Sequence, residues 1–107
     1  MDPVDFQQKI KGLREYEITS DEPHVSMRCE ENDFKLENIK RIIINQEFPL
    51  VRVIQDRANV YKAYYRLSRK TELKVIVSIF DCRKLNIRTV RRLRSDFKLG
   101  RMKRQRF

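Results

Sequence analysis

His24 and Arg28 are the residues whose types and spacing best suit chemistry. They lie four residues apart in a segment expected to be helical, so their side chains would share one helix face. A histidine can transfer a proton near neutral pH, and a guanidinium can bind a phosphate through two parallel hydrogen bonds. The pair could therefore support acid–base cleavage of a phosphodiester. The alternative is a purely structural role, in which His24 bonds a backbone group at the start of the helix and Arg28 is solvated.

A second candidate group comes from two neighbouring predicted strands. Lys62, Tyr64 and Arg66 alternate along the first strand, and Lys74 lies on the second. Alternate residues of a strand share one face of a sheet, and a face that mixes cations with an aromatic ring can bind phosphates and stack a base. The alternative is that the cations are ordinary solvent-facing residues and that the tyrosines pack in the core or pair across strands.

The C-terminal 25 residues are strongly basic. Residues 83–107 hold eleven Lys or Arg and one acid, and so carry the whole formal net charge of +10. Binding of Lys and Arg to phosphates releases counterions, which makes nucleic acid the first partner to expect, although an acidic protein would be attracted as well. The predicted nucleic-acid-binding residues of this segment are Arg88, Arg91, Arg92, Arg94, Lys98, Arg101, Lys103 and Arg104.

Apolar residues at helical spacing predict helices in the first half of the chain. Phe6, Ile10 and Leu13 recur at i, i+4 and i+7, and a similar stripe precedes Pro49. The predicted helices cover about residues 3–14, 22–31 and 36–45, with a short extended piece at 16–19.

Beyond Pro49 the pattern changes to short runs rich in Val, Ile, Tyr and Phe. The turns between them are too short for parallel crossovers, so the strands must pair as antiparallel hairpins. The prediction is an α+β fold, with N-terminal helices packed on one face of a four-stranded antiparallel meander and a basic C-terminal helix or arm. The predicted strands are 50–55, 60–67, 73–80 and 85–91; the domain is 1–91, followed by a basic extension, 92–107, with a helix at about 92–99 and an arm at 101–107.

Several classes of site and location are not expected. The two glycines do not form a nucleotide-binding loop, and Cys29 and Cys82 lie far apart with only one histidine in the chain. We therefore expect neither a metal nor a cofactor. No apolar run is long enough to span a membrane and the N-terminus does not resemble a secretory signal, so a cytoplasmic location is expected.

The segment from His24 to Ile39, with Arg28 and Leu36, resembles the His-x-x-x-Arg segment of the DUF4258 family, whose members are similar in fold to the RelE, HigB and BrnT toxins. Residues 60–66, 73–81 and 87–90 also fit the strand pattern of that family, and the resemblance covers residues 16–91. Cys29 replaces the usual Met of the motif.

The resemblance implies a RelE-like, metal-independent endoribonuclease of toxin–antitoxin type, similar to an mRNA interferase, which cleaves RNA by attack of a 2′-hydroxyl on the adjacent phosphate. In that scheme His24 is the general acid or base and Arg28 stabilises the phosphate. The implied partners are RNA, either on the ribosome or alone, and an acidic antitoxin protein. The alternatives are a non-catalytic nucleic-acid-binding protein and an interaction subunit that binds an acidic partner through its basic tail.

Overall fold

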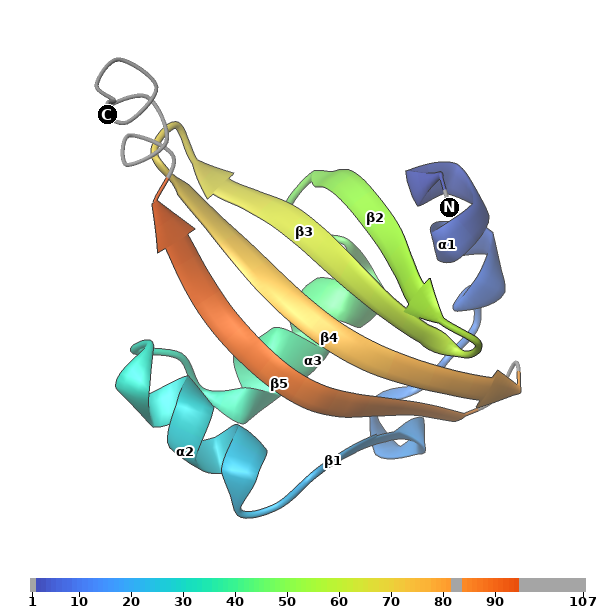
Figure 1. Ribbon diagram of the computed structural model, residues 1–107, viewed down its shortest axis with the longest axis horizontal. Coiled ribbons are helices and arrows are strands. Elements are labelled where there is room, and N and C mark those ends of the chain that lie inside the picture. Colours follow the sequence, from blue (N-terminus) through green and yellow to red (C-terminus); the bar gives the residue numbers. More distant parts are fainter. Residues whose placement is uncertain (1, 82–83, 95–107) are drawn as a thin grey trace.

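A five-stranded mixed sheet is the framework of the protein. The computed structural model describes residues 2–81 and 84–94, in which three α-helices and one short 3-10 helix accompany five strands arranged in the order β1-β5-β4-β3-β2 (Figure 1). The elements are α1 (Pro3–Lys9), the 3-10 helix (Glu15–Glu17), β1 (Ile18–Ser20), α2 (His24–Glu31), α3 (Leu36–Asn45), β2 (Leu50–Arg57), β3 (Val60–Ser68), β4 (Thr71–Asp81) and β5 (Lys84–Arg94).

The α+β class is confirmed, but the prediction of four antiparallel strands is wrong. The short segment Ile18–Ser20 forms a fifth strand, which pairs in parallel with β5 through Ile18 opposite Leu85 and Ser20 opposite Ile87. The other strands are antiparallel neighbours. Three residues carry too little periodicity to show a strand. Their pairing depends on a partner more than 60 residues away, which local pattern cannot reveal.

The first helix is shorter than the predicted 3–14. Asp2 caps it by accepting a hydrogen bond from the backbone N–H of Val4 at 2.8 Å, and the helix ends at Lys9. Gly12 has a φ of 85°, a left-handed conformation that a helix cannot continue through. Phe6, Ile10 and Leu13 are nevertheless all buried. The apolar spacing therefore identified core residues correctly and overestimated the length of the helix.

The core lies between the sheet and the helices. Val25 and Cys29 of α2 and Ile39 and Ile43 of α3 are buried in one cluster with the strand residues of the inner face. In Figure 1, α3 lies behind the sheet, whereas α1 lies next to β2 and α2 next to β5. The buried residues of all three helices, including Phe6 of α1, therefore belong to the core on the inner face of the sheet.

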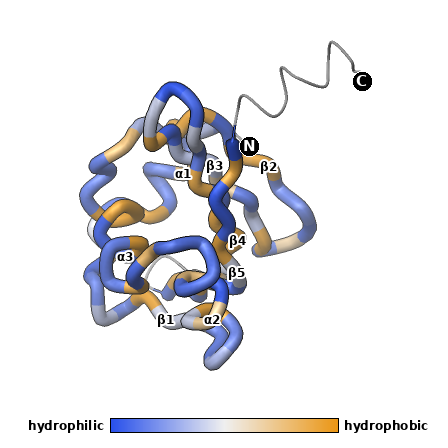
Figure 2. The backbone as a smooth tube through the Cα atoms, turned by 90° about the vertical axis from the view of Figure 1, so that its left-hand side faces the viewer, coloured by the Kyte–Doolittle hydropathy of each residue, from blue (hydrophilic) through white to orange (hydrophobic). Residues whose placement is uncertain are grey.

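The strands divide their residues between two faces, and hydrophobic and hydrophilic residues alternate along them (Figure 2). The inner face carries the apolar core, including Ala63, Tyr65, Leu73, Val75 and Ile87. The opposite face is called the outer face below. By register it consists of Arg52 and Ile54 of β2, Lys62, Tyr64 and Arg66 of β3, Glu72, Lys74 and Ile76 of β4, and Thr89, Arg91 and Leu93 of β5.

The last strand is longer than predicted. It continues to Arg94, with Arg92 opposite Leu73 and Arg94 opposite Thr71. The predicted helix over 92–99 is therefore wrong for residues 92–94, which belong to the sheet, and its remainder and the arm at 101–107 lie outside the described residues. Val90 and Leu93 recur at helical spacing, but pairing along the whole of β4 forms a strand and places them on opposite faces of the sheet.

The burial of the inner face predicts a clear difference between two isoleucines. Ile87 is fully buried and Ile54 on the outer face is 44% exposed. We expect Ile87→Ala to lower the free energy of unfolding by about 2–5 kcal/mol, because it leaves a cavity in the core. The matched Ile54→Ala should change it by less than about 1 kcal/mol. Urea unfolding of both variants measures the difference, and equal losses would contradict this assignment of faces.

Candidate nucleic-acid interface

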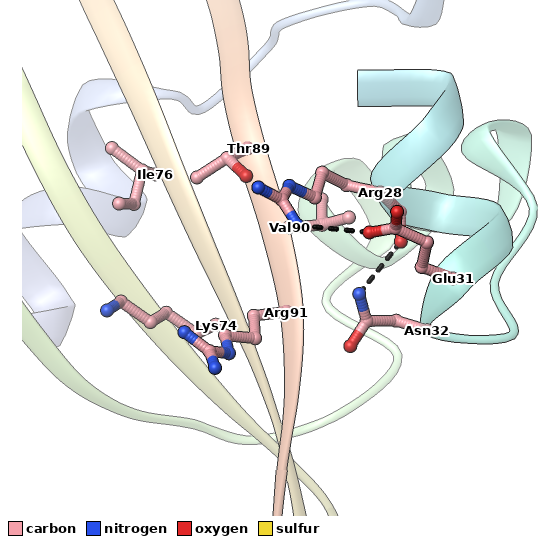
Figure 3. Close-up of a pocket in the computed structure, with 8 residues that line it drawn as sticks. All are labelled: Arg28, Glu31, Asn32, Lys74, Ile76, Thr89, Val90 and Arg91. Carbon is pink, nitrogen blue, oxygen red and sulfur yellow. Dashed lines mark hydrogen bonds and ion pairs between the residues drawn. The ribbon is translucent and has the colours of Figure 1, made fainter. Parts of the chain in front are cut away.

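A cleft of about 560 Å³ lies where α2 meets the outer face of the sheet. One wall comes from α2 and the residue after it, and the other from β4 and β5 (Figure 3). The lining residues are Arg28, Glu31, Asn32, Lys74, Ile76, Thr89, Val90 and Arg91. Three of them are cations, and they come from three different elements.

The β4–β5 pairing places two of these cations side by side. Lys74 lies opposite Arg91, and Ile76 lies opposite Thr89, so the four side chains form two adjacent rows on the outer face. Directly opposed residues have Cβ atoms about 5 Å apart. A phosphate in the cleft could therefore contact the ammonium of Lys74 and the guanidinium of Arg91 together.

Arg28 completes the basic lining from the α2 side. Its Nη1 donates a hydrogen bond to Oε1 of Glu31 at 3.0 Å, one helical turn away. Both side chains are about half exposed, and an ion pair of this kind contributes little to stability. The guanidinium can therefore exchange its carboxylate partner for a phosphate at small cost.

The structure separates His24 from this group. His24 is the first residue of α2 and is exposed, whereas the cleft begins one turn later at Arg28. Arg28 thus lines the same cleft as Lys74 and Arg91, whereas His24 does not. The role of His24 as a general acid or base stays a prediction.

The ring of Tyr64 is covered by cationic side chains rather than exposed to solvent. It is only 8% exposed, and the guanidinium carbon of Arg52 lies 4.0 Å from the centroid of its ring. The ammonium of Lys74 lies 6.0 Å from the same centroid. These are cation–π distances, so the electron-rich ring helps to hold both charges. A base could stack on Tyr64 only if Arg52 moved away.

Arg52 and Glu72 belong to the same arrangement, and sequence reasoning missed both. Nη2 of Arg52 lies 3.5 Å from Oε1 of Glu72, and Nη2 of Arg66 lies 3.3 Å from Oε2. The alternation of Arg52 with buried Val53 could have placed Arg52 on the outer face. The contacts of Arg52 with Tyr64 and Glu72 depend on the register of three strands. Alternation along a single strand does not determine that register.

Two predicted contact residues have other neighbours. Nζ of Lys62 lies 3.9 Å from Oδ1 of Asp56, although Lys62 pairs across the strands with the cleft residue Ile76. Arg88 lies at a bulge between the paired residues Ile87 and Thr89, and its Nε is 3.9 Å from Oδ2 of Asp21. The bulge removes Arg88 from the regular alternation, so it does not join the cleft row.

Arg92 holds α2 against the sheet. Its backbone N–H donates to Oδ1 of Asn32 at 2.9 Å, and its Nε donates to the backbone carbonyl of Asn32 at 3.1 Å. Its guanidinium also lies 4.3 Å from the ring centroid of Phe34. Arg92, predicted to contact nucleic acid, is therefore engaged within the protein.

The remaining predicted contact residues lie toward the end of the chain. Arg94 lines a shallow pocket next to the cleft, with Glu31, Asn32, Asp33, Thr71 and Arg92. Lys98, Arg101, Lys103 and Arg104 lie outside the described residues.

Two titratable groups near the site are poor candidates for chemistry. Cys29 faces the core, and burial raises the pKa of its thiol, which disfavours the reactive thiolate. Burial also raises the pKa of Tyr65 on the inner face. Proton transfer at the cleft would therefore have to use other side chains.

Comparison with known proteins adds no assignment: no family model matches the chain, and no curated protein or solved structure matches it either. The resemblance to DUF4258 thus stays a prediction.

Within residues 2–81 and 84–94, the structure contains no group of three or more His, Cys, Asp or Glu side chains that could hold a metal ion. In the same part of the chain, every helix is too short or too polar to cross a membrane.

Asn32 is expected to stabilise the junction between α2 and β5. Besides accepting from Arg92, its Nδ2 donates to the backbone carbonyl of Arg28 at 2.8 Å. We expect Asn32→Ala to cost about 1–3 kcal/mol, because it leaves the Arg92 N–H and a helix carbonyl without these partners. Chemical unfolding and amide hydrogen exchange at Arg92 measure the effect.

Asn38→Ala is the matched control, because Asn38 accepts from Arg41 in an exposed turn of α3. The control should change stability by less than about 0.5 kcal/mol. Equal stability of the two variants, with unchanged exchange at Arg92, would contradict the role of Asn32.

Proposed function

We propose that this chain binds RNA through the outer face of its sheet, with a backbone phosphate in the cleft beside α2. The observation that carries the proposal is the convergence of Arg28, Lys74 and Arg91 on one cleft. Guanidinium and ammonium groups are the side chains that bind phosphates, and release of counterions makes such binding favourable. The basic segment from residue 83 onward supports the same class of partner.

A single-stranded RNA suits this surface better than a duplex. The cleft is local and lies beside a twisted sheet that also carries Arg52 and Arg66. A flexible single strand can bend to place successive phosphates on separate cations, whereas an A-form helix presents its phosphates in a fixed geometry. A cytoplasmic location, with RNA on or off the ribosome as the partner, is part of this proposal.

The cations of the cleft should contribute more to RNA affinity than cations elsewhere on the surface. We expect Lys74→Ala or Arg91→Ala to weaken binding of a single-stranded RNA of about ten nucleotides. Each change should also lower the slope of log K against log salt by about 0.7, the contribution of one phosphate contact to a single strand. Fluorescence anisotropy across a salt series measures both quantities.

Lys9→Ala is the control for loss of one charge, since Lys9 is exposed on α1 at the opposite side of the sheet. Its affinity and salt slope should match those of the parent within error. If the Lys9 and Lys74 variants bind alike, the cleft is not the phosphate site.

RNA cleavage is a second candidate function, favoured by the carboxylate in the cleft. Glu31 lies 3.0 Å from Arg28 and lines the same cleft as Lys74. A carboxylate can accept the proton of an attacking 2′-hydroxyl while the cations stabilise the developing negative charge on the phosphate. On this proposal Glu31, rather than the more distant His24, is the first candidate for the general base.

The toxin–antitoxin role belongs to this second proposal. The sequence resemblance to DUF4258 supports it, together with an acidic antitoxin as the protein partner. The basic tail could instead serve an interaction subunit, and its predicted contacts beyond Arg94 fall outside the described residues.

Incubation of the purified chain with labelled RNA in EDTA tests for cleavage. We expect Glu31→Gln to slow cleavage by about 10²–10⁴-fold without weakening RNA binding, because it removes a proton acceptor and no cation. The control Glu30→Gln, an exposed neighbour on α2 that does not line the cleft, should cleave at the parent rate. Intact RNA with the parent chain, or equal rates for the two variants, would refute this role of Glu31.

A further inference from the structure

Glu72 is an acidic residue in the middle of a basic surface. Its side chain is 3% exposed, although it lies on the outer face opposite Arg66. One carboxylate oxygen lies 3.5 Å from Nη2 of Arg52, and the other lies 3.3 Å from Nη2 of Arg66. The carboxylate thus joins β2, β3 and β4 through two arginines.

Arg52 is held from a second side by Tyr64. The guanidinium carbon lies 4.0 Å from the ring centroid, so the side chain is fixed by a carboxylate and by an aromatic face. Arg52 and Arg66 nevertheless remain 41% and 48% exposed. A guanidinium has five N–H donors, and a contact to one carboxylate oxygen leaves donors that can face solvent.

Glu72 also makes the close approach of the two arginines possible. Arg52, Arg66 and Lys74 come from adjacent strands, and like charges at such spacing repel one another. A carboxylate between two of them offsets this repulsion and restricts the rotamers of both. Side chains that are already ordered lose less entropy when they bind a ligand.

We propose that Glu72 is a positioning residue that holds Arg52 and Arg66 as a second phosphate-binding subsite, and that this acid therefore strengthens RNA binding. The inference rests on the proposed function. Arg52, Tyr64, Lys74 and Arg91 are successive cross-strand partners, so Arg52 of the second subsite lies on one row with the cleft cations, and Arg66 lies on the neighbouring row opposite Glu72. With strands about 4.8 Å apart, the row extends for about 14 Å from Arg91 to Arg52. An RNA strand would follow it across the strands.

Replacement of Glu72 by Gln separates positioning from simple charge. Glu72→Gln raises the net charge by one, and so does Glu37→Gln at an exposed position of α3. If charge alone governed affinity, both variants would bind RNA at least as tightly as the parent. We expect Glu72→Gln to bind about two- to tenfold more weakly, which is the loss expected when one or two long side chains must be ordered on binding. Equal or tighter binding by Glu72→Gln would overturn the inference.

Arg52→Lys provides a second test that does not remove the buried acid. It keeps the charge but loses the planar fork that contacts Glu72 and Tyr64. Arg57→Lys, on the same strand and beside Asp56, is the matched control. We expect the Arg52 variant to bind RNA about two- to tenfold more weakly than the control. Equal binding would overturn the inference even if Glu72→Gln failed to fold.

The two proposals fail in different ways. A parent chain with no salt-dependent affinity for RNA would refute the proposed function, and the inference with it. If Lys74→Ala weakens RNA binding while Glu72→Gln and Arg52→Lys do not, the cleft is supported as a phosphate site and the second subsite is refuted.

Discussion

The contact between Asn32 and Arg92 determines where α2 lies against the sheet. Along the first part of β5 the edge is covered by β1, and the backbone N–H of Asp21 donates to the carbonyl of Ile87 at 3.0 Å just beyond it. Farther along, Asn32 receives the N–H of Arg92. Because both ends of α2 are tied to the same strand, Arg28 and Glu31 have a fixed place above that edge.

Charge favours the same arrangement. The C-terminal end of a helix carries partial negative charge on its last carbonyls, and the guanidinium of Arg92 donates to the carbonyl of Asn32, directly after α2. This arginine is used to build the site, which leaves Arg28, Lys74 and Arg91 to face the cleft. Arg91 and Arg92 are adjacent in sequence but point to opposite faces of one strand. Arg91 therefore faces the cleft, whereas Arg92 binds the end of α2.

The outer face combines cations with a few well-placed acids. Glu31 forms an ion pair with Arg28 in the cleft, whereas Glu72 contacts Arg52 and Arg66 outside the cleft. Each acid lowers the repulsion between neighbouring cations and limits their motion. The exposed pair at Glu31 can open readily, whereas the buried carboxylate of Glu72 holds its arginines in place. Two parts of one basic surface thus differ in rigidity.

The sequence was informative where local pattern decides structure. The strand predicted at 60–67 is observed as Val60–Ser68, because alternation and flanking polar turns are local signals. The extended piece expected at 16–19 overlaps β1 (Ile18–Ser20), but its parallel pairing with β5 and the extension of β5 over residues 92–94 depend on partners far away in the chain. The same limit applies to the site. Arg28 and Lys74 could be nominated from their residue types, but the contacts of Arg52 with Tyr64 and Glu72 follow from strand register.

Binding of RNA in the cleft is tested most directly by an NMR titration of the full chain with a single-stranded RNA, following backbone amides and the side-chain N–H groups of arginine. If phosphates bind in the cleft, the largest shifts occur at Arg28, Lys74 and Arg91, with little change on α1 and α3. Shifts spread evenly over exposed Lys and Arg, or concentrated on α1 or α3, would contradict binding in the cleft.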